Sequence, residues 1–333
     1  MTENTNTEVL YLVLDEGAEA IKNELDLPYL DALGEMGENI FQKKVIQDLA
    51  EENQKKVSQL ITKLLQLSIE PEEYRRAIQL AVLKGMREAT QPHHAMTPDA
   101  VSLFLGYLVN KLLSYEDLEK PVLLDPAVGA GNLMTAVMNQ LEGKGHFVGA
   151  DPDETLLKLA FTNANLQKHS VDLFHQDSVS TSLLKNVDLV LSDLPAGYYP
   201  NDTIADGFGT KANEGHSYVH HLLIEQAIEH VKPGGFAIFL VPNNIFQTDQ
   251  SQNLHAYIKN HAMIYSLMQL PSSMFKNQDA AKSILVLRKK VQGMVEPRQA
   301  LLAELPSFTR EQALADMMQK ISIWFDDHLK QEK

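Results

Sequence analysis

Pro121-Val-Leu-Leu-Asp-Pro-Ala-Val-Gly-Ala-Gly-Asn-Leu133 is the stretch around which the chain is organised. An apolar run ends in Asp125, glycines follow at 129 and 131, and apolar residues recur at helical spacing from Asn132 onward. This order predicts a strand, a tight loop and a helix. Such a loop brings backbone N–H groups close to a ligand, and glycine is needed because a Cβ would obstruct both the turn and the approach. Taken alone, the stretch predicts a nucleotide-like ligand without specifying which one.

Composition limits the classes of protein to consider. The chain has 333 residues, 44% hydrophobic and 22% charged, which is typical of a soluble protein with room for two domains. It contains no cysteine, and no apolar run approaches the ~20 residues that cross a bilayer, so we expect a cytoplasmic protein without a membrane anchor. The net charge of −15 argues against tight, autonomous binding to nucleic acid, which usually requires a basic surface.

The N-terminal part, residues 1–90, is predicted to be a helical domain. Its apolar stripe is expected on one long helix, which either packs on its neighbours or forms a dimer seam. A second helix is expected from Pro71 to Glu88, because proline and acidic residues favour a helix start. The stripe consists of Ile46, Leu49, Val57, Leu60, Leu64 and Leu67.

Strands and helices alternate in residues 91–290, which predicts a Rossmann-like, doubly wound α/β sheet. Seven strands are expected, and the last is expected to be antiparallel because no helix-length crossover precedes it. A C-terminal helical tail, 291–333, follows, with its helix from Arg310 to Leu329. The predicted strands are centred on 122–124, 145–151, 171–177, 189–191, 236–242, 263–270 and 283–287.

Three acidic residues lie at the ends of predicted strands. Asp151 follows the glycine loop by about 20 residues, a spacing at which an acid accepts hydrogen bonds from ribose hydroxyls, although an aspartate can also simply start the next helix. Asp177 lies just past the third strand, and Asp193 begins Asp193-Leu-Pro195 after the fourth. The carboxyl edge of a parallel sheet is where ligands bind, so all three are candidate site residues.

Two loops allow more than one interpretation. His93 and His94 are metal ligands, catalytic bases or plain loop residues; no third ligand lies nearby, and we expect no metal site. Residues 201–216 are polar and glycine-rich, and a loop beside the site is a candidate lid.

Taken together, these motifs resemble the class I S-adenosylmethionine-dependent methyltransferases. The chain is most similar to the N6-adenine DNA methylases, a group that includes the methylation subunits of type I restriction systems. The resemblance rests on the glycine loop, on the strand-end acids and on the blocks Ala95-Met-Thr-Pro98, Lys232-Pro-Gly-Gly235 and Leu270-Pro-Ser-Ser-Met-Phe275. It implies S-adenosylmethionine as cofactor, with the methionine end at Thr97, the ribose at Asp151 and the adenine at Asp177. The cofactor-binding residues that it implies are Thr97, Asp125, Pro126, Ala127, Gly129, Gly131, Asn132, Asp151, Asp177 and Asp193.

The catalytic motif of that group is Asn, Asp or Ser, then Pro-Pro, then an aromatic residue. Asp193 and Pro195 match it, whereas Leu194 and Ala196 do not, and Ser192 as the polar residue fits less well. The resemblance implies that the polar side chain accepts a hydrogen bond from the target amino group while the aromatic stacks on a flipped base. Tyr198 or Tyr199 could supply that stacking face.

Several functions are compatible with these motifs. The first is N-methyl transfer to adenine in DNA, or to RNA, with a separate recognition partner, because no basic recognition segment stands out. The second is S-adenosylmethionine binding with lost or altered catalysis, and the third is methylation of a protein or small molecule. A nicotinamide dehydrogenase is disfavoured because Met134 stands where its fingerprint requires a third glycine. A homodimer is compatible with the sequence, which does not otherwise support one.

Overall fold

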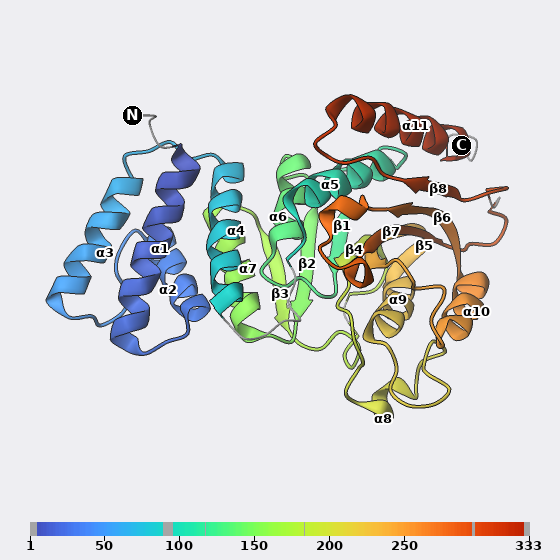
Figure 1. Ribbon diagram of the computed structural model, residues 1–333, viewed down its shortest axis with the longest axis horizontal. Coiled ribbons are helices and arrows are strands. Elements are labelled where there is room, and N and C mark those ends of the chain that lie inside the picture. The colour runs from blue at the N-terminus through green and yellow to red at the C-terminus, as the bar shows by residue number, and fades with distance from the viewer. Residues whose placement is uncertain (1–4, 89–95, 117, 183, 295–296, 330–333) are drawn as a thin grey trace. The chain divides into compact units, whose positions relative to one another are not determined.

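The computed structural model describes residues 5–88, 96–116, 118–182, 184–294 and 297–329, and Figure 1 labels their helices and strands. Contacts divide the chain into two compact units. The first comprises residues 1–106 and 128–175, and the second comprises residues 107–127 and 176–333. The histidines at 93 and 94, together with Ala95, lie outside the described residues. No helix in the described part of the chain combines the length and apolar character needed to cross a bilayer.

The first unit is mainly helical, and its first helix has a reciprocal cap. The Thr5 hydroxyl accepts the N–H of Glu8, and the Glu8 carboxylate accepts the N–H of Thr5 at 2.9 Å, which satisfies two N–H groups that the helix leaves unpaired. The elements of this unit are α1 (Asn6–Leu25), α2 (Tyr29–Gln42), α3 (Glu51–Leu64), α4 (Pro71–Glu88), the start of α5 (Asp99–Leu113), α6 (Asn132–Gln140), β2 (His146–Asp151), α7 (Glu154–Leu166) and β3 (Val171–His175).

The N-terminal helices share one apolar core with α7. Helix α2 lies so close to α7 that a Cβ on Gly37 would come within 2.1 Å of Cγ2 of Thr162. Glu35 on α2 also forms an ion pair with Lys158 on α7. The contacts therefore group the N-terminal helices with residues 128–175, and the boundaries 1–90, 91–290 and 291–333 stay predictions about domain organisation.

One helix begins later than the apolar stripe suggested. Helix α4 runs from Pro71 to Glu88 as expected, but α3 begins at Glu51, and Ile46 lies in the preceding loop with 48% of its surface exposed. The Asn39 side chain accepts the N–H of Ile46 at 2.9 Å, and Lys43 ends α2 in a left-handed conformation. These local bonds hold the chain in a turn, so the first apolar positions of the stripe do not belong to the helix.

The second unit contains six strands in the order β1-β4-β5-β7-β6-β8, while β2 and β3 pair in parallel in the first unit. Strands β1, β4 and β5 are mutually parallel, and β7 runs antiparallel between β5 and β6. The elements of the second unit are β1 (Val122–Asp125), β4 (Val187–Asp193), α8 (Asp202–Ala205), α9 (Val219–His230), β5 (Val231–Pro242), α10 (Ser251–His261), β6 (Ala262–Gln269), the 3-10 helices Ser272–Met274 and Gln278–Ala280, β7 (Lys282–Lys289), β8 (Leu301–Glu304) and α11 (Glu311–Leu329).

The expected fold class is confirmed: a mostly parallel sheet with an antiparallel strand near its end, plus N-terminal helices. Within the described residues the sheet has eight strands rather than seven, because the C-terminal segment contributes β8, which pairs in parallel with β6. Four residues are too few for a period to reveal a strand. The predicted tail helix is present as α11, and its Trp324 packs edge-on against Tyr265 of β6, with ring centroids 5.9 Å apart.

Candidate functional site

Asp125 ends β1 and is tied to the neighbouring strand. Its Oδ1 accepts the backbone N–H of Ala127 at 3.0 Å and the hydroxyl of Ser192, from β4, at 2.6 Å. Asp125 and Ser192 are both buried. The hydroxyl of Ser192 is thus committed to shaping the start of the glycine loop, and its geometry favours a structural role over the catalytic role considered from the sequence.

Two glycines in the loop adopt positive φ angles for different reasons. A Cβ on Gly129 (φ +53°) would meet no atom within 4 Å, so open space lies beside this residue. A Cβ on Gly131 (φ +76°) would lie 3.1 Å from Cα of Ala160, so this glycine lets α7 approach the loop. The glycine pattern therefore separates into one position open to a ligand and one position required by packing.

The Asp151 carboxylate lies beside the open glycine. Its Oδ2 accepts the N–H of Gly129 at 2.8 Å, and its Oδ1 accepts the N–H of Asp153 at 2.9 Å. Asp151 is buried at the end of β2. A buried acid fixed at the carboxyl end of a parallel strand is well suited to bind ribose hydroxyls.

Thr97 and Asn132 are also brought together. The Asn132 side chain donates to the carbonyl of Thr97 at 3.1 Å, and its oxygen accepts from Nη1 of Arg75 at 2.9 Å. All three residues are buried. The side-chain amide of Asn132 is therefore already bonded to protein groups. A ligand would instead bind the backbone N–H of Asn132, in the first turn of α6. Arg75 is a further residue of this site that the sequence does not predict, because its one local signal is the glutamate three residues before it on α4.

Asp177 is held by residues of the second unit. Its Oδ1 accepts the N–H of Val179 at 2.9 Å, and its Oδ2 accepts the hydroxyl of Tyr199 at 2.5 Å. Ser178, next in sequence, donates its hydroxyl to the carbonyl of Pro126 at 2.7 Å, which fixes Asp177 relative to that part of the glycine loop. Burial and the hydrogen bond to Asp177 raise the pKa of Tyr199, which therefore remains a neutral donor.

Asp193 ends β4 and forms an ion pair with Lys282. The Nζ of Lys282 lies 2.5 Å from Oδ1 of Asp193, and both side chains are largely buried. Lys282 is the first residue of β7, and because β7 is antiparallel, its beginning lies level with the carboxyl ends of β4 and β5. Lys282 cannot be identified from the sequence, because its position beside Asp193 depends on the sheet topology, which places the start of an antiparallel strand at that edge.

The departures from the family motif have a local explanation. Leu194, which replaces the first proline, is buried and donates its N–H to the carbonyl of Leu240 at 3.2 Å. Proline has no N–H and could not make this bond. Pro195 follows at a half-buried position, and Ala196 is exposed. The chain thus extends the β4–β5 pairing by one residue beyond Asp193.

The two tyrosines after the motif have different environments. Tyr199 is buried, whereas Tyr198 is 59% exposed and stacks on Tyr218 with ring centroids 4.9 Å apart. Next to Tyr218 lie His220 and His221, which are buried. Burial lowers the pKa of His220 to about 3 and that of His221 to about 4, so both are neutral near pH 7. Of the two tyrosines, Tyr198 is the one whose ring is available to a ligand.

The predicted loop 201–216 is anchored at several points. At its base the carbonyl of Gly197 accepts from the N–H of Val219 at 3.1 Å, and the N–H of Tyr199 donates to the carbonyl of Ser217 at 2.8 Å. Within it, α8 forms, and the Glu225 carboxylate accepts two consecutive backbone N–H groups, those of residues 209 and 210. The absence of periodicity in the sequence thus concealed a loop with defined hydrogen bonds.

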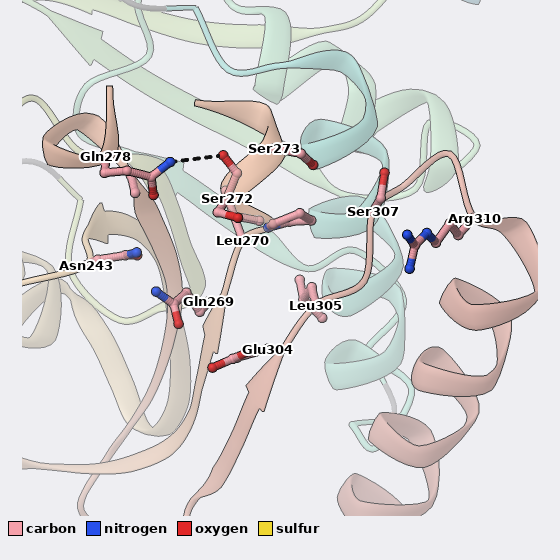
Figure 2. Close-up of a pocket in the computed structure, with 12 residues that line it drawn as sticks. Asn243, Gln269, Leu270, Ser272, Ser273, Gln278, Glu304, Leu305, Ser307 and Arg310 are labelled. Carbon is pink, nitrogen blue, oxygen red and sulfur yellow. Dashed lines mark hydrogen bonds between the residues drawn. The ribbon is translucent and has the colours of Figure 1, made fainter. Parts of the chain in front are cut away.

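A polar cavity of about 430 Å³ lies in the second unit. Figure 2 shows the side chains that line it. It opens beyond the carboxyl ends of β6 and β8, and no residue predicted from the sequence to form the site lines it. Asn243, on its wall, accepts a hydrogen bond from the hydroxyl of Ser283 at 2.7 Å, and Ser283 directly follows Lys282. The lining residues are Asn243, Gln269, Leu270, Pro271, Ser272, Ser273, Gln278, Ala281, Glu304, Leu305, Ser307 and Arg310.

Comparisons with known proteins agree with this geometry. The uncharacterized protein YtxK of Bacillus subtilis (strain 168) is 46% identical over 319 residues, which are 95% of this chain and 96% of that protein. The crystal structure of a proposed class I S-adenosylmethionine-dependent methyltransferase from Listeria monocytogenes is 40% identical, with a TM-score of 0.88 over 96% of this chain and 99% of that one. A modification subunit of a proposed type I restriction enzyme from Vibrio vulnificus YJ016 shares the fold at 15% identity, with a TM-score of 0.64 over 85% of this chain and 64% of that one.

Family models divide the chain near residue 86. Residues 8–86 match the YtxK N-terminal helical domain, and residues 87–319 match the N-6 DNA Methylase family. S-adenosylmethionine is the cofactor expected of this family, and the local geometry fits it: an open positive-φ glycine lies beside a buried strand-end carboxylate in the first unit. The chain belongs to the N-6 DNA methylase family and has the fold of an S-adenosylmethionine-dependent methyltransferase.

Proposed function

We propose that this protein is an active N-methyltransferase that methylates an exocyclic amino group of a nucleic-acid base, with adenine N6 in DNA as the leading acceptor. The observation that supports it most directly is the position of Asp193. Its carboxylate ends the fourth strand, is fixed by Lys282 and precedes an exposed aromatic stack formed by Tyr198 and Tyr218. The motif position that lacks an aromatic ring, Ala196, therefore has a substitute two residues along the chain.

The proposed mechanism assigns each residue a role in positioning. S-adenosylmethionine supplies an activated methyl group on a sulfonium sulfur. The Asp193 carboxylate accepts a hydrogen bond from the acceptor N–H, which localises the nitrogen lone pair for in-line attack. The carbonyl of Leu194 accepts the second amino hydrogen, and Tyr198 stacks on the base. As the bond from the nitrogen to the methyl carbon forms, the bond from that carbon to sulfur would break and S-adenosylhomocysteine would leave. The methylated nitrogen then loses one proton to solvent.

The cofactor residues have roles that follow from their local geometry. Gly129 leaves space for the ligand, and Asp151 accepts hydrogen bonds from the ribose hydroxyls. In the second unit, Asp177 accepts from the adenine amino group, and the Tyr199 hydroxyl orients its carboxylate. Residues Asp125, Pro126 and Ala127 shape the loop. These assignments apply the family pattern to side chains that the structure shows to be fixed and largely buried.

A second function is favoured by one observation. The ammonium of Lys282 already donates to Asp193, so an incoming amino group must share that carboxylate with a cation. A protein that binds S-adenosylmethionine without transferring its methyl group, or that methylates a protein or small molecule, would tolerate this arrangement. Because the net charge is −15, we further propose that methylation of DNA or RNA requires a separate basic recognition partner.

The proposal is tested by methyl incorporation from S-adenosylmethionine labelled in its methyl group into unmethylated DNA, into RNA and into cell extract, with and without the fractionated extract as a source of partner. Asp193→Ala should abolish incorporation even at cofactor concentrations that saturate the variant. Asp188→Ala is the matched control, because Asp188 forms a similar ion pair with Lys232, at 2.7 Å, at the other end of the same strand. Absence of incorporation into every nucleic acid under all these conditions would refute the proposal.

A further inference from the structure

Arg75 is a fully buried cation in the N-terminal helical region. Its side chain has 0% exposure, and it is the largest of the completely buried side chains of the described residues. Burial alone would lower the pKa of Arg75, but the ion pairs with Glu72 and Asp99 raise it. The guanidinium is therefore charged, and a buried charge of this kind is retained only where its hydrogen bonds are satisfied.

The partners of the guanidinium lie on three helices of the first unit. Nε and Nη2 bind the two Glu72 oxygens, at 2.8 and 2.5 Å, in a bidentate arrangement within α4. Nη2 also donates to Asp99, the first residue of α5. Nη1 donates to Oδ1 of Asn132 at 2.9 Å, the first residue of α6. The planar fork thus joins three helix segments in one fixed geometry.

Two of these partners adjoin residues expected to hold the cofactor. Asn132 directly follows Gly131, and its amide donates to the carbonyl of Thr97 at 3.1 Å. Asp99 lies two residues after Thr97. At the far end of α6, Asn139 donates to Glu72 at 3.2 Å, so α4 holds α6 at both ends. The position of the helix that follows the glycine loop is therefore set by side chains of α4.

We propose that Arg75 is a positioning residue for the methionine end of S-adenosylmethionine, so that the N-terminal helices set cofactor affinity. The inference rests on the cofactor assignment but not on methyl transfer itself. Thr97 is the residue expected at the methionine end. The first turn of α6 directly follows the glycine loop, and the Asn132 side chain joins that turn to the carbonyl of Thr97. Loss of the guanidinium frees Asn132 and Asp99 to move, and these two residues flank that end of the site.

The experiment compares two ligands that differ only at the methionine end. Isothermal titration calorimetry gives the Kd of the full chain for S-adenosylhomocysteine and for 5′-methylthioadenosine, which lacks the amino-acid portion. Arg75→Met should weaken S-adenosylhomocysteine about tenfold, a typical coupling between two sites, and should change the 5′-methylthioadenosine Kd less than about twofold. The Kd of Arg75→Lys for S-adenosylhomocysteine should lie between the values of Arg75→Met and the wild type. Arg76→Met is the matched control, since Arg76 is the next residue on α4, is about half exposed and binds only Glu72 among the contacts described.

A second variant separates positioning from a folding defect. Arg75→Met removes the cation bound to Asp99 and one of the two cations bound to Glu72, and it can destabilise the chain for that reason alone. The triple variant Glu72→Gln, Arg75→Met, Asp99→Asn removes the whole charge cluster, and circular dichroism with thermal unfolding shows whether each variant is folded. The same selective loss of S-adenosylhomocysteine affinity is expected.

Two outcomes would overturn the inference. One is a folded triple variant with wild-type affinity for both ligands, and the other is an equal loss of affinity for both. A wild-type chain that binds both ligands but methylates no nucleic acid would refute the proposed function, and the two Kd values would still decide the role of Arg75.

Discussion

The Nζ of Lys282 and Oδ1 of Asp193 are 2.5 Å apart, although 89 residues separate them and β5 lies between their strands. The pair joins the beginning of an antiparallel strand to the end of a parallel one. A carboxylate held by a cation has a defined orientation, and in-line transfer depends on such orientation. The pair is therefore the first place at which to test the proposed chemistry.

Lys282→Met should lower the rate of methyl transfer about 10- to 100-fold, because an unrestrained Asp193 no longer holds the acceptor in line. Lys282→Arg, which keeps the cation, should retain most of the rate. The measurement is single-turnover transfer with saturating cofactor. Lys232→Met provides the control, since it removes the partner of Asp188 at the opposite end of β4. An unchanged rate in Lys282→Met would contradict the positioning role, and a rate above that of the wild type would identify the lysine as an inhibitor of Asp193.

The two loop glycines should respond differently to alanine. At Gly131 a Cβ meets Ala160 at 3.1 Å and φ is positive, so we expect Gly131→Ala to lower the free energy of unfolding by about 1–3 kcal/mol. Gly129→Ala has the same backbone strain but no contact, so its main effect should be on cofactor affinity. Chemical denaturation and calorimetric titration of both variants give the two quantities. Equal cofactor affinity in Gly129→Ala and the wild type would show that the ligand does not approach this residue.

Ser192→Ala should affect stability rather than chemistry. The variant removes a buried hydroxyl that donates to Asp125, which should cost about 1–3 kcal/mol of unfolding free energy. The rate of transfer at saturating cofactor should be unchanged, since Asp193 is the residue assigned to the acceptor. A large fall in that rate, with cofactor affinity intact, would restore Ser192 as a catalytic candidate.

Tyr198 and Tyr199 should separate substrate stacking from cofactor orientation. Tyr198→Ala should raise the KM for the nucleic acid by the loss of about 1–3 kcal/mol of stacking and leave cofactor affinity unchanged. Tyr199→Phe removes the hydroxyl that donates to Asp177, so it should weaken the cofactor and spare the KM of the acceptor. Steady-state kinetics and titration of the cofactor distinguish the two patterns, and identical patterns in both variants would contradict the assignment.

Because His220 is buried and neutral, the free energy of unfolding should decrease in acid. Its pKa falls from 6.5 to about 3 on folding because of burial, with smaller contributions from His221 and Lys282. Between these values the unfolded state binds more protons, so the free energy of unfolding decreases as pH falls below 6.5, by about 2 kcal/mol at pH 5 for this residue. His220→Leu should flatten that part of the curve of unfolding free energy against pH. An unchanged pH dependence in His220→Leu would contradict this assignment.

The sequence was most informative where the signal is local. Glycines 129 and 131, the buried apolar strands and the acids at strand ends depend on short-range geometry, and the structure shows Gly129 and Asp151 in direct contact. Arg75 and Lys282 could not be found this way, because the site residues that they bind, Asn132 and Asp193, lie 57 and 89 residues away. Those contacts are set by helix packing and by an antiparallel strand. Likewise, nothing in the sequence around the two adjacent tyrosines indicates that Tyr199 is buried and Tyr198 is exposed.

Two backbone hydrogen bonds join residues 197 and 199 to residues 219 and 217, at the base of the loop 201–216. Because these bonds fix the two ends of the loop, closing a slightly longer loop costs little additional free energy. Insertions at the exposed turn of Glu214 and Gly215 should leave Asp193 and the Tyr198 stack in place. Removal of residues 209 and 210 would instead leave the buried Glu225 carboxylate without the two N–H groups that it accepts. The segment can therefore vary at its exposed turn without rebuilding the strand end that carries Asp193.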